Sequence, residues 1–63
     1  MMRRNFIQRI ENKIELKNYI IRPNEVVVEL SDAVYKLDLN NLVVNHVSGR
    51  YSQLIHENLI KEV

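Results

Sequence analysis

The sequence contains no cysteine and only one glycine. The absence of cysteine excludes disulfides, thiolate zinc sites and thiol catalysis together. A single glycine excludes the glycine-rich loops that hold phosphate groups. No apolar run approaches the roughly 18 residues of a membrane span, and the basic start "MMRRNFIQRIENK" lacks the apolar stretch of a signal peptide. We therefore expect a cytoplasmic protein without a membrane partner.

The chain has 63 residues and is expected to form a single small domain over residues 1–63. A domain of this size buries only about 60% of its unfolded surface and is marginally stable alone. Small folds therefore recruit disulfides, a metal ion or another subunit. Hydrophobic residues make up 46% of the chain, too many for a disordered segment. Composition indicates a packed core that self-association or a partner would stabilise further.

Residues 29–46, "ELSDAVYKLDLNNLVVNH", have two interpretations. A helix would place several apolar residues on a near-heptad stripe, but the many valines lose rotamer freedom in a helix. Serine, aspartate and asparagine would also compete for its backbone hydrogen bonds. As strands, the segment breaks into short apolar runs at Ser31–Asp32 and Asn40–Asn41. The helical stripe would consist of Val27, Leu30, Val34, Leu37 and Val44.

The strand interpretation is internally consistent. A two-residue turn at Ser31–Asp32 places Val28 opposite Tyr35. A second turn at Asn40–Asn41, with asparagine supplying the positive φ, places Tyr35 opposite His46. A one-residue slip in either hairpin would mix the two faces, so we predict a three-stranded antiparallel meander. Its apolar face would carry Val26, Val28, Leu30, Ala33, Tyr35, Leu37, Leu39, Leu42, Val44 and His46.

The N-terminal flank suits a helix followed by another strand. The helix would run from Asn5 as N-cap to about Lys13, with its apolar side formed by Phe6, Ile7 and Ile10. Residues 14–21 then alternate as a fourth strand, with Ile14, Leu16 and Ile20 on one side. This strand would end at the turn Arg22-Pro23-Asn24-Glu25. The sequence leaves its pairing register against residues 25–30 undetermined.

The C-terminal flank returns to a helical period after Ser48–Gly49. Ser48 is the candidate cap, and the expected core stripe consists of Tyr51, Leu54, Ile55 and Leu59. An antiparallel sheet with one apolar face needs cover. The predicted fold class is therefore α+β, an antiparallel three- or four-stranded β-meander with an N-terminal and a C-terminal helix packed on one face.

Candidate catalytic groups are few. His46 is expected near the rim opposite Tyr35, either as a metal ligand or general base or, more simply, as a side chain packed on the tyrosine. Ser52, His56 and Glu57 include a nucleophile and a base, but neighbouring helical residues point in different directions. The carboxylates are dispersed, and there is no His-x-x-x-His pair. We expect a protein that is not an enzyme, with no cofactor, metal ion or small-molecule substrate.

Two local resemblances assign no family. The order helix, strands, helix resembles double-stranded RNA-binding domains, which carry a basic cluster at the start of their last helix. The matching segment "SGRYSQLIHE" contains only Arg50. The stretch "VELSDAVYKL" is similar to the Ser-Gln-Glu-Leu-Asp stretch of small aspartyl-phosphate phosphatases, which are helical hairpins. Their essential aspartate would fall on Tyr35, so neither resemblance keeps the residues on which its function depends.

The second face of the predicted sheet is a candidate protein interface. Valines are scattered there among charged and polar side chains, with Val34 expected directly opposite Val47. Residues 42–47 contain no Lys, Pro or Glu to protect this edge of the sheet. A half-apolar open face on a marginal domain indicates a homodimer or a protein partner. The candidate residues are Val27, Val34, Val43, Val47, Lys36, Asn45 and Ile60.

An alternative is nucleic-acid binding by the N-terminal helix. Residues 1–22 contain six basic and two acidic residues, a net charge of +4, whereas residues 23–63 contain three basic and six acidic residues, a net charge of −3. Arg3, Arg4, Arg9 and Lys13 would contact phosphates without reading sequence, or would simply form a solvated helix face. No aromatic residue is interleaved with them for base stacking.

The sequence therefore favours a non-enzymatic interaction or regulatory protein that self-associates or inhibits a partner. The many asparagine, isoleucine and lysine residues are typical of an AT-rich genome. A small stand-alone domain of this composition fits a phage or mobile-element accessory protein.

Overall fold

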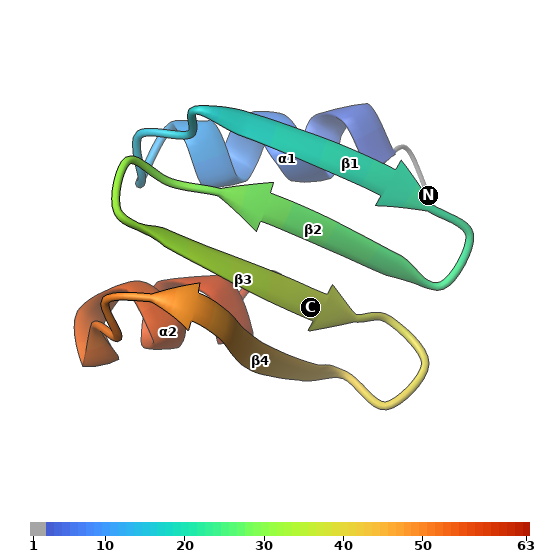
Figure 1. The fold of residues 1–63 in the computed structure, drawn as a ribbon. Coiled ribbons are helices and arrows are strands. Elements are labelled where there is room, and N and C mark those ends of the chain that lie inside the picture. Colours follow the sequence, from blue (N-terminus) through green and yellow to red (C-terminus); the bar gives the residue numbers. More distant parts are fainter. Residues whose placement is uncertain (1–2) are drawn as a thin grey trace.

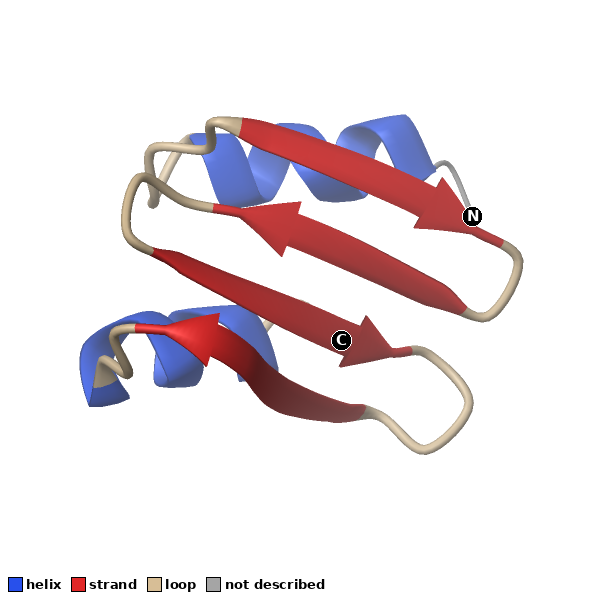
Figure 2. Ribbon diagram, viewed as in Figure 1, coloured by secondary structure: helices blue, strands red, loops and turns tan. Residues whose placement is uncertain are grey.

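A computed structural model describes residues 3–63, and the side chains from residue 6 onward. Four strands form one antiparallel sheet in the order β1-β2-β3-β4. Both helices lie behind the same face of this sheet (Figure 1, Figure 2). This arrangement confirms the predicted α+β meander with four strands. The elements are α1 (Arg3–Glu11), β1 (Asn18–Arg22), β2 (Glu25–Glu29), β3 (Ala33–Asp38), β4 (Val43–Gly49) and α2 (Gln53–Ile60).

The hairpin of β2 and β3 has the predicted register. Val28 lies opposite Tyr35. The turn at Ser31–Asp32 is closed by a 2.8 Å hydrogen bond from the N–H of Leu30 to the carbonyl of Ala33. Apolar residues two apart on both strands therefore fall on the helix side of the sheet, where they are buried.

The first strand is shorter than residues 14–21. It begins at Asn18, and its register follows from the two-residue turn Pro23–Asn24, which places Arg22 opposite Glu25 and Ile20 opposite Val27. Residues 14 and 16 precede the strand and pack against the core from a loop.

The connection between β3 and β4 differs from the predicted two-residue turn. Tyr35 does lie opposite His46, but the turn spans residues 39–42. The carboxylate of Asp38 accepts hydrogen bonds from the N–H groups of Asn40 and Asn41 at 2.9 and 3.0 Å, which holds the wider turn. The positive φ of 58° falls on Leu42 instead of an asparagine. Leu42 is 62% exposed, so its predicted place on the apolar face is wrong.

A β-bulge interrupts β4 at Val47. Tyr35 pairs with His46 whereas Val34 pairs with Ser48, so Val47 is the extra residue. The predicted contact of Val34 directly opposite Val47 is therefore wrong. The strand ends at Gly49, which has a φ of 79°.

Helix α1 has the predicted apolar side, with Phe6, Ile7 and Ile10 buried. It begins at Arg3, so Asn5 lies inside the helix and is not its N-cap. Its final turn carries hydrogen bonds as far as the N–H of Ile14. The predicted end near residue 13 is therefore close to the observed one.

Helix α2 differs from its prediction in both cap and buried side. Its N-cap is Ser52, whose hydroxyl accepts a hydrogen bond from the N–H of Ile55, and not Ser48, which belongs to β4. Leu59 is buried, but Leu54 is 70% exposed. Because successive helical residues are rotated by about 100°, a side centred on Ile55 and Leu59 turns Leu54 to solvent. Tyr51 precedes the helix and is also exposed.

One core joins the sheet to both helices. Its members are all apolar apart from the hydroxyl of Tyr35, and they come from every element except β1. The buried residues are Phe6, Ile7, Ile10, Val26, Val28, Leu30, Ala33, Tyr35, Leu37, Val44 and Leu59.

Candidate functional site: the open face of the sheet

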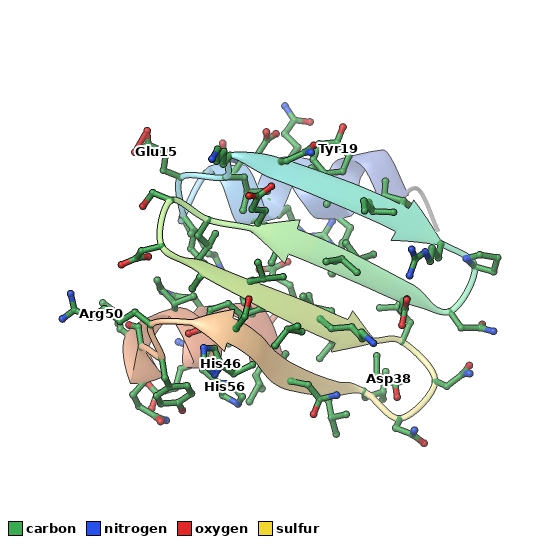
Figure 3. All side chains as sticks on the ribbon, viewed as in Figure 1. Glu15, Tyr19, Asp38, His46, Arg50 and His56 are labelled. Carbon is green, nitrogen blue, oxygen red and sulfur yellow. The ribbon has the colours of Figure 1, made fainter. Side chains whose placement is uncertain are left out.

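The face of the sheet opposite the helices carries most of the predicted interface. Side chains alternate across a strand, and the neighbours of Val27 and Val34 in the chain are buried on the helix side. Lys36 pairs with Asn45, and the registers bring both of them to the face of Val27 and Val34. This open face is turned toward the viewer in Figure 3.

The apolar part of the open face is a small group that includes a residue of β1. Ile20 lies directly opposite Val27, and Val34 is one strand further along the diagonal. A depression of about 120 Å³ lies over this group and is bordered by Asn18, Tyr19 and Glu29. We call Ile20, Val27 and Val34 the open-face patch. Its three members come from three adjacent strands, so the backbone hydrogen bonds between these strands fix their relative positions.

The charges around the patch are paired with one another. Glu25 accepts a 2.7 Å hydrogen bond from Arg22 and lies 3.8 Å from the amine of Lys36. Lys17 and Glu29 are 3.9 Å apart at the opposite end of the strands. The open face therefore has an apolar centre between ion pairs, in which positive and negative side chains alternate with each other.

Asp38 marks one corner of the open face and serves the adjacent turn. The backbone N–H of Asn41, its side-chain amide and the N–H of Asn40 all donate to this carboxylate. These hydrogen bonds hold the pKa of Asp38 below its ordinary value. The Asp38 carboxylate therefore stabilises the turn between β3 and β4.

Two predicted interface residues, Val47 and Ile60, are not members of the open-face patch. Val47 is the bulged residue of β4, and Ile60 belongs to α2, which covers the other face of the sheet (Figure 1). Val43 is opposite Asp38 at the far corner of the open face. The structure therefore brings Val27, Val34, Lys36, Asn45 and Val43 to the open face. Val47 lies in the bulge next to Ser48, the partner of Val34.

Sequence reasoning did not assign the apolar side chains of β1 to an interface. Tyr19, Ile20 and Ile21 are exposed by 42%, 48% and 38%. The signal that could have found them is the turn at Pro23–Asn24, since a two-residue hairpin fixes the register of the strand before it. That register makes β1 an exposed edge strand.

Two of the four predicted nucleic-acid contacts form ion pairs within the chain. Arg9 and Lys13 each form a 2.7 Å ion pair with Glu62, whose side chain is only 9% exposed. The hydrogen bonds from Lys13 and then Arg9 lower the pKa of Glu62. The side chains of Arg3 and Arg4 lie outside the described residues. Two of the four cations thus tie the C-terminal turn to α1.

The histidines form part of an aromatic row at the β4 side. The ring of His46 lies 5.2 Å from that of Tyr35, as predicted, and 5.7 Å from that of Tyr51. Tyr51 in turn lies 5.7 Å from His56. Figure 3 labels the two histidines of this row. Within the described part of the chain, the Nδ1 of His56 is buried and has no hydrogen-bond partner. The Ser52 hydroxyl accepts the capping hydrogen bond from the N–H of Ile55 at 3.3 Å.

Among residues 3–63 there is no cluster of three or more side chains suited to hold a metal ion. In the same part of the chain, no helix has the length and apolarity that crossing a membrane would require.

Comparison with models of protein families, with curated proteins and with solved structures finds no match for this chain. The geometry of the open face therefore carries the functional argument alone.

Proposed function

We propose that this protein is a small non-enzymatic interaction protein that acts through protein–protein contacts made by its sheet. The observation that carries the proposal is the open-face patch, an apolar group on the uncovered side of the sheet. Apolar surface rimmed by polar groups is typical of protein interfaces. A partner that buried this patch would also stabilise a domain whose own core is small.

The ion pairs around the patch support a protein partner over a nucleic acid. Glu25 and Glu29 lie on the same face as the patch, and both are paired with cations of this chain. A polyanion approaching this face would meet carboxylates, whereas a polar rim with mixed charge suits another protein surface. The alternative site on α1 has its Arg9 and Lys13 already paired with Glu62.

Site-specific photo-cross-linking in cells tests the proposal. A photoreactive amino acid at Val34 is expected to capture a protein, whereas the same group at Leu54, an exposed apolar position on α2, is not. The captured protein would then be purified and titrated with variants. We expect Val34→Lys to weaken its binding about tenfold or more, with Leu54→Lys unchanged. Equal capture at both positions, or recovery of nucleic acid alone, would contradict the proposal.

A further inference from the structure

Strand β1 is an edge strand, and no strand of residues 3–63 pairs with its outer side. It lies at one end of the sheet order, and α1 lies behind β1 and β2 (Figure 1). Tyr19, Ile20 and Ile21 occupy its centre, and all five residues of the strand are exposed. The strand contains neither proline nor a bulge. An exposed edge with an apolar centre is a template for another strand.

The backbone groups that face outward can be identified. The N–H of Leu30 donates to β3. Because residues in an antiparallel ladder alternate in direction, Val27 directs its N–H and C=O toward β1. Its partner Ile20 therefore bonds inward. Tyr19 and Ile21 then direct their N–H and C=O groups to the free edge.

One further contact agrees with this assignment. The N–H of Tyr19 lies 2.8 Å from the side-chain oxygen of Asn18, the preceding residue, instead of taking part in the ladder with β2. Tyr19 lies at the outer edge of the sheet in Figure 3. An incoming strand would replace this local hydrogen bond by one to a backbone carbonyl.

We propose that a second copy of this chain pairs with β1 in antiparallel orientation, with Ile20 of the two copies opposite each other on a twofold axis. Tyr19 of each copy then exchanges backbone hydrogen bonds with Ile21 of the other. The pairing joins two four-stranded sheets into one continuous sheet. Both open faces lie on the same side, because directly opposed residues of antiparallel strands share a face.

The sequence of β1 is complementary to itself in this register only. Residues 18–22 read polar, apolar, apolar, apolar, polar, so Asn18 faces Arg22 and no like charges are opposed. Shifting the pairing by two residues in one direction places Pro23, which has no N–H, opposite Tyr19. Shifting it in the other direction places Lys17 opposite an isoleucine.

The other edge of the sheet is less suited to pairing. The bulge at Val47 increases the local twist of β4 and interrupts its ladder. The sequence predicted an unprotected edge at residues 42–47 and did not predict this bulge. Pairing through β1 instead brings the two open-face patches together at Ile20. The inference goes beyond the proposed function, since the edge would pair whether or not the open face binds a third protein.

A cysteine placed on the twofold axis tests the proposal, because the chain has no cysteine of its own. In the dimer the two Cα atoms at position 20 are a non-hydrogen-bonded pair, about 4.5 Å apart and within disulfide range. We expect Ile20→Cys to form a covalent dimer on mild oxidation. Val27→Cys, on the same face one strand inward, would be about 14 Å from its equivalent and is expected to cross-link at least about tenfold more slowly.

A backbone variant separates edge pairing from contact between open faces. Ile21→Pro removes an outward N–H and no hydrogen bond to β2, so it is expected to fold and to lose the dimer. Ile21→Thr keeps the N–H and is expected to remain dimeric. Circular dichroism confirms folding of both variants. A wild-type monomer, a dimeric Ile21→Pro variant, or cross-linking of Val27→Cys as fast as Ile20→Cys would each overturn the proposal.

Discussion

The hydroxyl of Tyr35 accepts a 2.9 Å hydrogen bond from the backbone N–H of Ser52. Tyr35 is fully buried at the centre of β3, and Ser52 is the N-cap of α2. One side chain of the sheet therefore satisfies a donor at the beginning of the helix. This contact, with the burial of Leu59, positions α2 on the helix side and leaves the open face uncovered.

Tyr35→Phe is expected to lower the free energy of unfolding by about 1 kcal/mol, because a partly buried N–H loses its acceptor while the ring keeps its packing. Urea denaturation measures the change. Tyr51→Phe is the matched control, since its hydroxyl bonds to Gln53 at an exposed site. Equal effects of the two substitutions would show that the Tyr35–Ser52 hydrogen bond does not anchor the helix.

Gly49→Ala is expected to destabilise the fold by about 2 kcal/mol or more. Its φ is 79°, and an added Cβ would overlap the carbonyl oxygen of Asp32 and lie 2.7 Å from the Cα of Ala33. Thermal unfolding followed by circular dichroism measures the loss. Ser48→Ala, at the adjacent exposed position, should stay within about 0.5 kcal/mol of wild type; a comparable loss there would contradict this reason.

Leu42→Gly is expected to raise the free energy of unfolding by about 0.5–1 kcal/mol. Leu42 adopts a φ of 58°, which costs a residue with a Cβ about 1–2 kcal/mol, and the greater chain entropy of glycine offsets part of the gain. Leu42→Ala removes the same exposed side chain but keeps the Cβ. If alanine stabilises the protein as much as glycine in urea denaturation, backbone strain is not the cause.

Glu62→Gln is expected to reduce stability at neutral pH by up to about 1 kcal/mol, since its partners Arg9 and Lys13 are largely solvated. The pKa of Glu62 is lowered from 4.5 in the folded state. The unfolded state therefore binds more protons, and the contribution of Glu62 is complete above pH 4.5 and is lost as the pH falls through the folded-state pKa.

Denaturation at a series of pH values checks this dependence. The wild-type and Glu62→Gln curves should converge in acid. Glu57→Gln should differ little from wild type throughout, because the exposed Glu57 carboxylate on α2 accepts a hydrogen bond from the neutral side chain of Gln53. A difference between wild type and Glu62→Gln that stays constant with pH would show that the ion pairs do not contribute.

The sequence predicted features that depend on alternation and missed those that depend on a single backbone angle. Val28 opposite Tyr35 follows from the requirement that both hairpins share one apolar face. The positive φ of Leu42 and the bulge at Val47 are not marked by the residue types in the sequence, since neither position carries the glycine or asparagine that favours a positive φ.

The candidate site was predicted in part for the same reason. Val27 and Val34 follow from the alternation of the central strands, whereas Ile20 required the register of β1. Leu54 was misplaced because α2 is only eight residues long, and packing rather than periodicity sets its rotation.

We propose that this protein acts through contacts between protein chains made by its sheet. The most direct measurement is the mass of the purified protein by light scattering after size-exclusion chromatography, with the absorbance spectrum recorded for nucleic acid. We expect wild type to have twice the mass of the chain and no bound nucleic acid, and Ile21→Pro to have the mass of one chain. A wild-type monomer that carries nucleic acid and releases it in high salt would contradict the proposed function.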